Sequence, residues 1–508
     1  MPKTLESTDA ATAARRRPTP ARLAWLIGPA LVAGVAYLDP GNVASNMTAG
    51  ARYGYLLVWV VVLGNVMAWL IQYLSAKLGI VTGRSLPETL GTRIRRPWAR
   101  RAYWLQAELV AMATDIAEVI GGAVALNLLF GIPLLWGGVI TGTVSIALLL
   151  VQSRRGARPF EFVVIGLLAI IAIGFSFGVF VAPPDPAGVV AGLVPRFEGT
   201  DSVLLAASIL GATIMPHAIY AHSALARDRF APTPRSSSAP TSRSSSAPTP
   251  RSSSERSETK RPEPPTTESA TDAAPLNPAR SLSERSETKR PEPSTGPLSR
   301  TPLATTDAST GVPVDLSLAE LRGIPTRRLL RATKWDVTIA MLIAGTVNLC
   351  ILLLAAANLA GVPGTDSLEG AYAALYAGLG PLVATLFAVG LLASGLASTS
   401  VGAYAGAEIM HGLLHVRVPL LARRLVTLIP ALVILAIGFD PTVALVLSQV
   451  VLSFGIPFAL IPLVALTAKH EVLGGYRNRV WTTVAGVAAS VFLIALNGVL
   501  LWLVLTGA

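Results

Sequence analysis

Long runs of apolar residues, separated by short polar stretches, dominate the 508 residues of this chain. A helix needs roughly 20 apolar residues to cross a bilayer, and the run at 480–506 contains no charged residue. The pattern therefore predicts an all-α integral membrane protein with eleven membrane helices. The predicted helices span residues 23–46, 54–80, 103–130, 132–151, 160–182, 201–225, 335–360, 374–413, 423–438, 441–468 and 480–506.

The composition agrees with a protein that faces lipid. Hydrophobic residues make up 52% of the chain, charged residues only 14%, and the mean hydropathy is +0.57, whereas soluble proteins carry about 25% charged residues. The net charge of +12 lies largely in loops between apolar runs, so we expect the bilayer and not nucleic acid as a partner. The single cysteine, Cys350, excludes a disulfide within the chain and a multi-cysteine metal site.

The placement of Lys and Arg predicts the orientation of the helices, because basic residues concentrate in cytoplasmic loops. With a cytoplasmic N-terminus, the inner side carries Arg93, Arg95, Arg96, Arg100, Arg101, Arg154, Arg155, Arg158, Arg227, Arg229, Arg417, Arg423, Arg424, Lys469, Arg477 and Arg479. The outer loops contain little beyond Arg52 and Arg196. We therefore expect an extracytoplasmic C-terminus, and the short tails and Ala/Arg-rich composition favour a bacterial inner (plasma) membrane.

Residues 228–316 have a different composition, rich in Ser, Pro, Thr, Arg and Glu. The stretch SERSETKRPEP at Ser254–Pro264 occurs again at Ser283–Pro293. Such a segment cannot bury enough apolar surface to offset the entropy of ordering it. We expect a disordered cytoplasmic insertion, and a neutral insertion is favoured over a phosphorylated or partner-binding segment.

The first apolar segment contains an Asp-Pro-Gly-Asn sequence, from Asp39 to Asn42. Pro40 and Gly41 interrupt a helix, and an interruption inside a membrane frees carbonyl groups that need partners. A cation is one such partner, because Asp39 supplies charge and Asn42 an amide oxygen. The alternative is a proline kink with Asp39 paired to a basic residue, but neighbouring segments contain no Lys or Arg at similar depth.

The sixth segment contains a second interruption, between Gly211 and His217, with Met215 just before Pro216. Interrupted helices at corresponding positions of two halves mark the substrate site in inverted-repeat transporters. We therefore predict two five-helix repeats with an eleventh helix appended. The predicted parts are a cytoplasmic tail (1–22), the first repeat (23–182), the sixth helix (201–225), the insertion (228–316), the rest of the second repeat (335–468) and the last helix (480–506).

The chemistry of Met215 indicates the kind of cation. A thioether adds little for Mg²⁺ or Ca²⁺ but suits softer metals, so Asp, Asn and Met together favour Mn²⁺, Fe²⁺, Co²⁺ or Cd²⁺. The alternative is a methionine that fills a gap in the core. His217 and His222 lie about 140° apart around a helix and cannot easily share one metal. Either histidine fits a proton route or a packing role.

The third segment carries Glu108, Asp115 and Glu118 along one stripe of a helix. Carboxylates arranged in this way inside a membrane are typical of a proton relay. The alternative is ion pairing, for which Arg423 and Arg424 at the inner start of the ninth segment are candidates. The two interpretations are compatible, because a proton route can end at such pairs.

With these residues in view, the chain resembles the Nramp family, the natural resistance-associated macrophage proteins. The resemblance rests on Asp39–Asn42, Met215–His217, Gln72–Gly79 (QYLSAKLG) and Asp115–Glu118 (DIAE). It covers nearly all of the membrane region and leaves out the tail and the insertion. It implies the leucine-transporter fold, and import of Mn²⁺ and related ions coupled to protons by alternating access.

The resemblance also implies roles for individual residues. The metal ligands would be the side chains of Asp39, Asn42 and Met215, the backbone carbonyls of Ala36 and Ala212, and the amide of Gln449. The proton pathway would include Asp39, His217, Glu108, Asp115, Glu118, Arg423 and Arg424. By the residues alone, Gln449 is an ordinary interhelical hydrogen-bonding amide. The metal is the substrate and the proton the coupling ion; no cofactor is expected, and we expect a functional monomer.

Some positions depart from the family pattern. Many members have Gln where this chain has Ala407, next to Glu408, and some have Gln at the position of Leu396; Ser45-Asn46 replaces a common Thr-Asp. None of these belongs to the predicted ligand set. The residues themselves leave open an amino-acid transporter of the same fold, an intramembrane hydrolase and a cation channel. No nucleophile–base pair or zinc motif supports an enzyme, and interrupted repeats favour alternating access over a channel.

Overall fold

A computed structural model describes residues 29–155, 157–230, 325–416 and 419–506. The predicted tail 1–22 lies outside these residues, as does nearly all of the predicted insertion 228–316. The described residues form α-helices and two short 3-10 turns.

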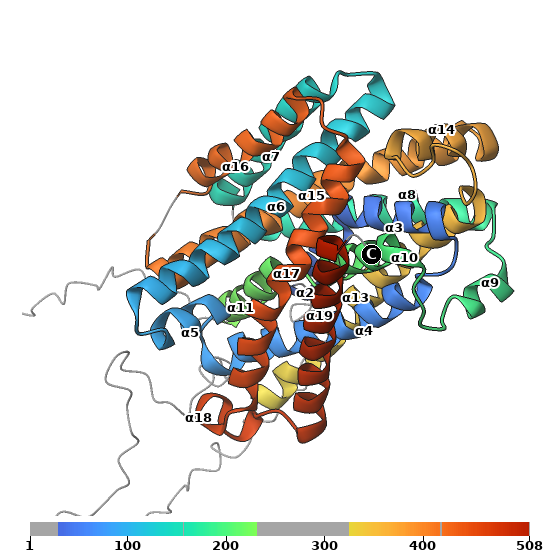
Figure 1. Cartoon of the computed structure of the whole chain (residues 1–508). Helices are drawn as coiled ribbons and strands as arrows, with labels where there is room; N and C mark the ends of the chain where they lie inside the picture. Colours follow the sequence, from blue (N-terminus) through green and yellow to red (C-terminus); the bar gives the residue numbers. More distant parts are fainter. Residues whose placement is uncertain (1–28, 156, 231–324, 417–418, 507–508) are drawn as a thin grey trace, which may run out of the picture. The chain divides into compact units, whose positions relative to one another are not determined.

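The first half of the chain contains the helices around the first interruption and the four long helices that follow (Figure 1). They are α2 (Pro29–Val35), η1 (Ala36–Leu38), α3 (Pro40–Tyr53), α4 (Val58–Thr82), α5 (Leu86–Arg93), α6 (Pro97–Phe130), α7 (Leu134–Arg155), α8 (Ala157–Val181) and α9 (Pro186–Ala191).

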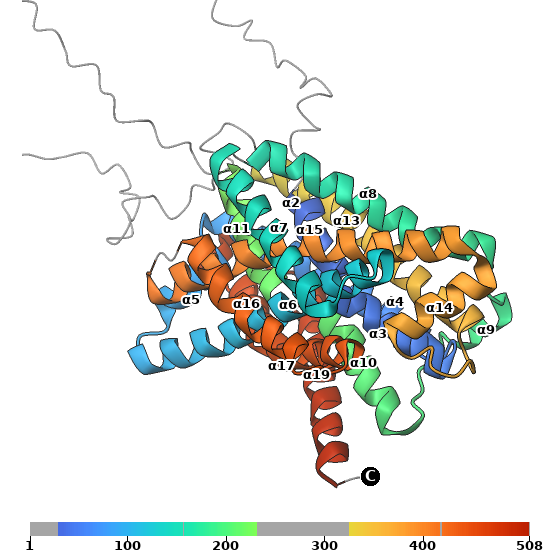
Figure 2. The same cartoon turned by 90° about the horizontal axis from the view of Figure 1, so that it is seen from above.

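The second half begins with the helix pair around the second interruption. It consists of α10 (Gly199–Thr213), α11 (Pro216–Phe230), α13 (Thr326–Asn358), α14 (Leu368–Leu379), α15 (Pro381–Leu414), α16 (Leu420–Ala436), α17 (Pro441–Ala468), α18 (His470–Leu473), η2 (Gly474–Tyr476) and α19 (Val480–Thr506). Figure 2 shows α19 at the margin of the bundle.

Within the described residues, eight helical segments are long and apolar enough on their own to cross a membrane. The other three predicted segments match an interrupted helix (α2 to α3), α7 with its shorter apolar part at Leu134–Leu148, and the 17-residue α16. The predicted segment 374–413 differs from the structure, because the chain breaks at Gly380, which has a φ of +86°. Residues before the break belong to the separate helix α14.

The two interrupted helices lie among long helices from both halves. α13 packs against α3 and α4, α15 packs against α6 and α8, and α10 packs against α17. α7 and α16 lie side by side and both pack on α6 (Figure 1). This arrangement buries most of α10 and α11 inside protein, away from lipid, which is where an interrupted helix is tolerated in a membrane.

Two glycines allow the interrupted helices to approach their neighbours closely. A methyl group on Gly121 of α6 would overlap the Pro40 ring, and one on Gly211 of α10 would overlap the backbone carbonyl of Gln449 on α17. Small residues at such crossings are typical of membrane helix pairs. The start of α3 is therefore held against α6, and the end of α10 against α17.

We expect Gly211→Ala to destabilise the protein by about 1–3 kcal/mol, because the added methyl group meets backbone and not a flexible side chain. The midpoint of thermal unfolding in detergent measures this. The control is Gly498→Ala on α19, where a methyl group would meet no atom within 4 Å. Equal midpoints for the two variants would show that this crossing is not tightly packed.

Candidate metal and proton site

The first helix interruption follows from the local sequence. Asp39 is extended (φ −69°, ψ 161°) between η1 and α3, and its Oδ1 accepts a hydrogen bond of 2.8 Å from the backbone N–H of Asn42. Asp at the N-cap with Pro at the first helical position is a favourable helix start. Asp39 is thus fully buried at the positive end of a helix dipole, which stabilises its negative charge.

The second interruption has the same form. α10 ends at Thr213, Ile214 leaves the helical region (φ −118°, ψ 60°), and Pro216 starts α11. Met215 between them is fully buried, as are Ala212 and His217. The hydroxyls of Ser45 on α3 and Ser208 on α10, 2.6 Å apart, connect the two interrupted helices.

Gln449 on α17 touches both interruptions. Its Nε2 donates a hydrogen bond of 2.9 Å to Asp39 Oδ2, and the same amide lies against Gly41, where a side chain would overlap it. Its backbone carbonyl lies against Gly211, one turn before the second interruption. The predicted ligand Gln449 therefore lies between the predicted ligands of the first and second repeats.

Asp39 has no cationic partner among the ion pairs of the described residues. Three buried amide oxygens near the first interruption also have no hydrogen-bond partner there: those of Gln449, Asn46 and Asn348. Each unsatisfied buried acceptor costs free energy. Oxygen ligands of this kind are suited to a divalent cation, so the cluster has an unused capacity to bind one.

The predicted ligand Asn42 already has partners in this structure. Its Nδ2 donates to the carbonyl of Tyr37 at 2.5 Å, and its Oδ1 accepts from Asn46 Nδ2 at 2.6 Å. The Asn42 oxygen therefore has one lone pair in use, and a cation would bind through the other or replace the Asn46 amide.

Sequence reasoning missed two residues that stabilise the freed carbonyls before Asp39. Asn348 Nδ2 on α13 donates to the Tyr37 carbonyl at 3.1 Å, and the Ser394 hydroxyl on α15 donates to the Leu38 carbonyl. The only available signal was a polar residue in an otherwise apolar helix. That signal does not identify a partner about 300 positions away in the chain.

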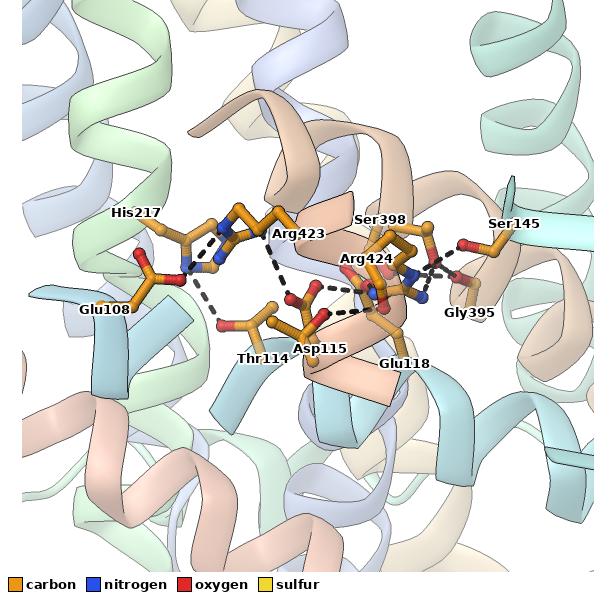
Figure 3. Close-up of polar contacts among 12 residues, drawn as sticks. Glu108, Thr114, Asp115, Glu118, Ser145, His217, Gly395, Ser398, Arg423 and Arg424 are labelled. Carbon is orange, nitrogen blue, oxygen red and sulfur yellow. Dashed lines mark hydrogen bonds and ion pairs between the residues drawn. The ribbon is translucent and has the colours of Figure 1, made fainter. Parts of the chain in front are cut away.

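The carboxylates of α6 form a buried ion-pair network with α16 (Figure 3). Arg423 Nε lies 3.0 Å from Glu108 Oε1, and its Nη1 lies 3.4 Å from Asp115 Oδ2. Arg424 Nη1 lies 2.7 Å from Asp115 Oδ1 and 3.3 Å from Glu118 Oε2. The ion-pair alternative is therefore present, and three carboxylates share two guanidinium groups.

His217 holds the second interruption against α6, beside this network. Its Nδ1 lies 3.2 Å from the hydroxyl of Thr114, the neighbour of Asp115 on α6 (Figure 3). On the other side, Pro40 packs against Gly121, one turn beyond Glu118. The network therefore lies next to both interruptions, on the helix that both of them contact.

His222 has a different environment from His217. Its Nδ1 lies 2.5 Å from Gln72 Oε1 on α4, and Ser75 Oγ donates to the Ile219 carbonyl at 2.6 Å. The Gln72–Gly79 motif thus packs α4 against α11. Of the two roles expected for a histidine in this segment, these contacts give His222 the packing role.

Glu408 and its neighbours form a separate cluster, where Arg227 lies 2.6 Å from Glu88 and 3.0 Å from Glu408. The side-chain ligand atoms of Glu88, Glu408 and His411 lie close enough together to hold a metal ion. The guanidinium of Arg227 already supplies the positive charge there. We assign this cluster to ion pairing between α5, α11 and α15.

Two interrupted helices meet at a buried carboxylate in this fold. The protein therefore belongs to the class of multi-span membrane transporters with the leucine-transporter architecture. A solved structure of MhsT in complex with L-phenylalanine has the same fold, with a TM-score of 0.52 at 10% identity, covering 96% of this chain and 99% of that one. This likeness concerns the fold alone.

The comparisons also identify the family. The model of the "natural resistance-associated macrophage protein-like" family matches residues 30–246 and 317–503, so this chain belongs to the Nramp family. A "divalent metal cation transporter MntH" from Mycobacterium tuberculosis is 51% identical over 95% of this chain and 92% of its own length. A crystal structure of an Eremococcus coleocola manganese transporter mutant has a TM-score of 0.68 at 29% identity, covering 95% of this chain and 87% of that one.

We expect Arg424→Leu to destabilise the protein by about 3–5 kcal/mol, because it leaves Asp115 and Glu118 buried without their cation. Thermal unfolding in detergent measures this, with the exposed Arg93→Leu as control. Adding Asp115→Asn to Arg424→Leu should restore part of the loss. A double variant no more stable than Arg424→Leu would argue against charge imbalance as the cause.

Proposed function

We propose that this protein imports divalent transition metal ions, Mn²⁺ first and Fe²⁺, Co²⁺ and Cd²⁺ as well, in symport with protons by alternating access. One observation carries the proposal: the buried carboxylate of Asp39 lacks a cationic partner among the described ion pairs, beside buried amide oxygens without partners. A divalent cation would pair with the Asp39 carboxylate and would also coordinate the free amide oxygens. The two relatives named above, a metal cation transporter and a manganese transporter, support the choice.

The metal would be held by both interrupted helices. Asp39 supplies the negative charge, Asn42 and Gln449 supply amide oxygens, and Met215 supplies the soft ligand. For this, the Gln449 amide must turn its free oxygen toward the metal, and Asn42 would use the lone pair that does not accept from Asn46. The backbone carbonyls of Ala36 and Ala212 complete the proposed set. The membrane potential favours entry by roughly 2.3 kcal/mol per charge per 100 mV.

The proton would pass from the region of Asp39 to the α6 network. His217 and Glu118 lie nearest the interruptions, Asp115 and Glu108 follow along α6, and the route ends at Arg423 and Arg424. Neighbouring carboxylates that share two guanidinium groups exchange a proton without leaving an isolated buried charge. The same groups thus stabilise α6 and carry the proton.

We propose a plasma-membrane location with a cytoplasmic N-terminus, an extracytoplasmic C-terminus and a functional monomer. In this orientation a pocket of about 270 Å³ opens outward, and its charged lining consists of Arg52, Asp201, Asp366 and Asp440. Arg52 lies 2.8 Å from Asp366 and 3.5 Å from Asp201. The acidic excess in this pocket attracts cations to the outer end of α3.

We expect Asp39→Asn to abolish Mn²⁺ uptake while leaving the protein folded, because the shape of the side chain is retained and its charge removed. The measurement is uptake into proteoliposomes that contain a pH dye, at a negative-inside potential, with Glu471→Gln on the exposed α18 as control. Metal entry with acidification of the lumen is expected for the unsubstituted protein. Metal entry without acidification would remove the proton role of the α6 network, and wild-type uptake by Asp39→Asn would remove the metal site.

We expect Met215→Ala to weaken discrimination between Mn²⁺ and Ca²⁺, because the remaining ligands are oxygens. Competition of Ca²⁺ with Mn²⁺ uptake measures this. Met341→Ala on α13 creates a comparable buried gap outside the proposed ligand set and controls for lost packing. Unchanged competition in Met215→Ala would assign Met215 to packing, and transport of an amino acid without metal would contradict the proposal.

A further inference from the structure

A pocket of about 840 Å³ lies away from both interruptions, between α4, α13 and η2. The start of α13 contributes Arg327, Arg331 and Lys334, and aromatic rings are contributed by Tyr73 and Tyr476. Figure 1 shows the yellow start of α13 near α18. The metal and proton residues do not line this pocket.

The basic residues form one face of a helix. Arg327, Arg331, Lys334 and Thr338 are spaced by four, three and four positions, which places them in one row. None of the three basic residues is paired with a carboxylate among the ion pairs of the described residues. Lys334 is held over the Trp69 ring at 5.5 Å. The pocket therefore contains three positive charges with no carboxylate partner in the part of the chain that the structure describes.

The row lies at the depth of lipid headgroups. α13 has 33 residues, so at about 1.5 Å per residue it measures roughly 50 Å, well beyond the roughly 30 Å of the hydrocarbon core. Its apolar part begins after the polar turns that carry the row. Trp335, with 63% of its surface exposed, marks the boundary, as aromatic residues do at membrane interfaces.

An exposed apolar track continues from the pocket toward the membrane centre. On α13 it consists of Trp335, Ile339 and Leu342, and the antiparallel α4 adds Val66 and Val62. The two helices are joined by a hydrogen bond of 2.9 Å from Trp69 Nε1 to Thr338 Oγ1. A ligand with an anionic headgroup and long acyl chains matches a basic pocket that continues into an exposed apolar track. A free anion would contact only the basic residues.

We propose that this pocket binds the phosphate headgroup of an anionic phospholipid, with the acyl chains on the track along α13 and α4. Basic pockets between membrane helices on the cytoplasmic side are suited to anionic headgroups. The assignment to the inner leaflet rests on the orientation proposed above; the binding site itself does not depend on metal transport. The lipid would hold the start of α13 to α4 and η2.

The test is binding of phosphatidylglycerol to the full-length protein in detergent, followed by native mass spectrometry, with phosphatidylcholine of the same acyl chains for comparison. At about 1 kcal/mol per basic residue, the triple variant Arg327→Gln/Arg331→Gln/Lys334→Gln should bind phosphatidylglycerol roughly a hundredfold more weakly. The matched control, Arg93→Gln/Arg95→Gln/Arg96→Gln, removes three exposed charges outside the pocket and should change binding less than about twofold.

Two further measurements distinguish binding of the lipid from binding of other anions. Leu342→Ser, on the apolar track, should weaken phosphatidylglycerol binding and leave inorganic phosphate binding unchanged. Inorganic phosphate that binds as tightly as the lipid would identify an anion site without lipid specificity and overturn the proposal. Equal binding of phosphatidylcholine, or an equal loss in both triple variants, would overturn it as well. Thermal unfolding without added lipid should be the same for both triple variants, since all six residues are exposed.

Discussion

The hydrogen bond from the Gln449 amide to the Asp39 carboxylate is the interaction on which the centre of this protein depends. Asp39 ends one helix segment and begins another, so its charge can be buried only where amide groups and a helix dipole replace water. Gln449 meets this need from a third helix, and its backbone fixes the second interruption through Gly211. The two halves are thereby joined around one negative charge.

The α6 network also contains buried carboxylates, but their charge is compensated in a different way. There three carboxylates pair with Arg423 and Arg424 inside the protein, while Asp39 has no such cation among the described pairs. Buried ion pairs add little net stability compared with apolar packing. Under the proposed function, these buried pairs have a second role as the proton route.

Much of this arrangement could be predicted from sequence, because apolar length, Pro-Gly interruptions and carboxylate spacing are local signals. The Asp39 and Pro216 breaks and the Glu108–Glu118 stripe belong to this group. The break at Gly380 was missed because apolar residues continue on both sides of it. Asn348 and Ser394 were missed because their partners lie hundreds of positions away, and only the folded chain brings those groups together.

The hydrogen bond between Asn46 and Asn42 has a consequence for the turnover of an alternating-access carrier. Such a carrier must return across the membrane without cargo in every cycle, and bare ligand groups would make the empty form costly to bury. If the ion binds as proposed, the amide N–H groups of Asn46 and Gln449 would take its place on Asn42 and Asp39 after it leaves. Ligands that bind the metal ion more tightly would release it more slowly. Weaker hydrogen bonds to the ligands in the empty carrier would slow its return across the membrane. Under the proposed function, the strength of the Asn46 hydrogen bond would therefore affect both the affinity for the ion and the speed of the return.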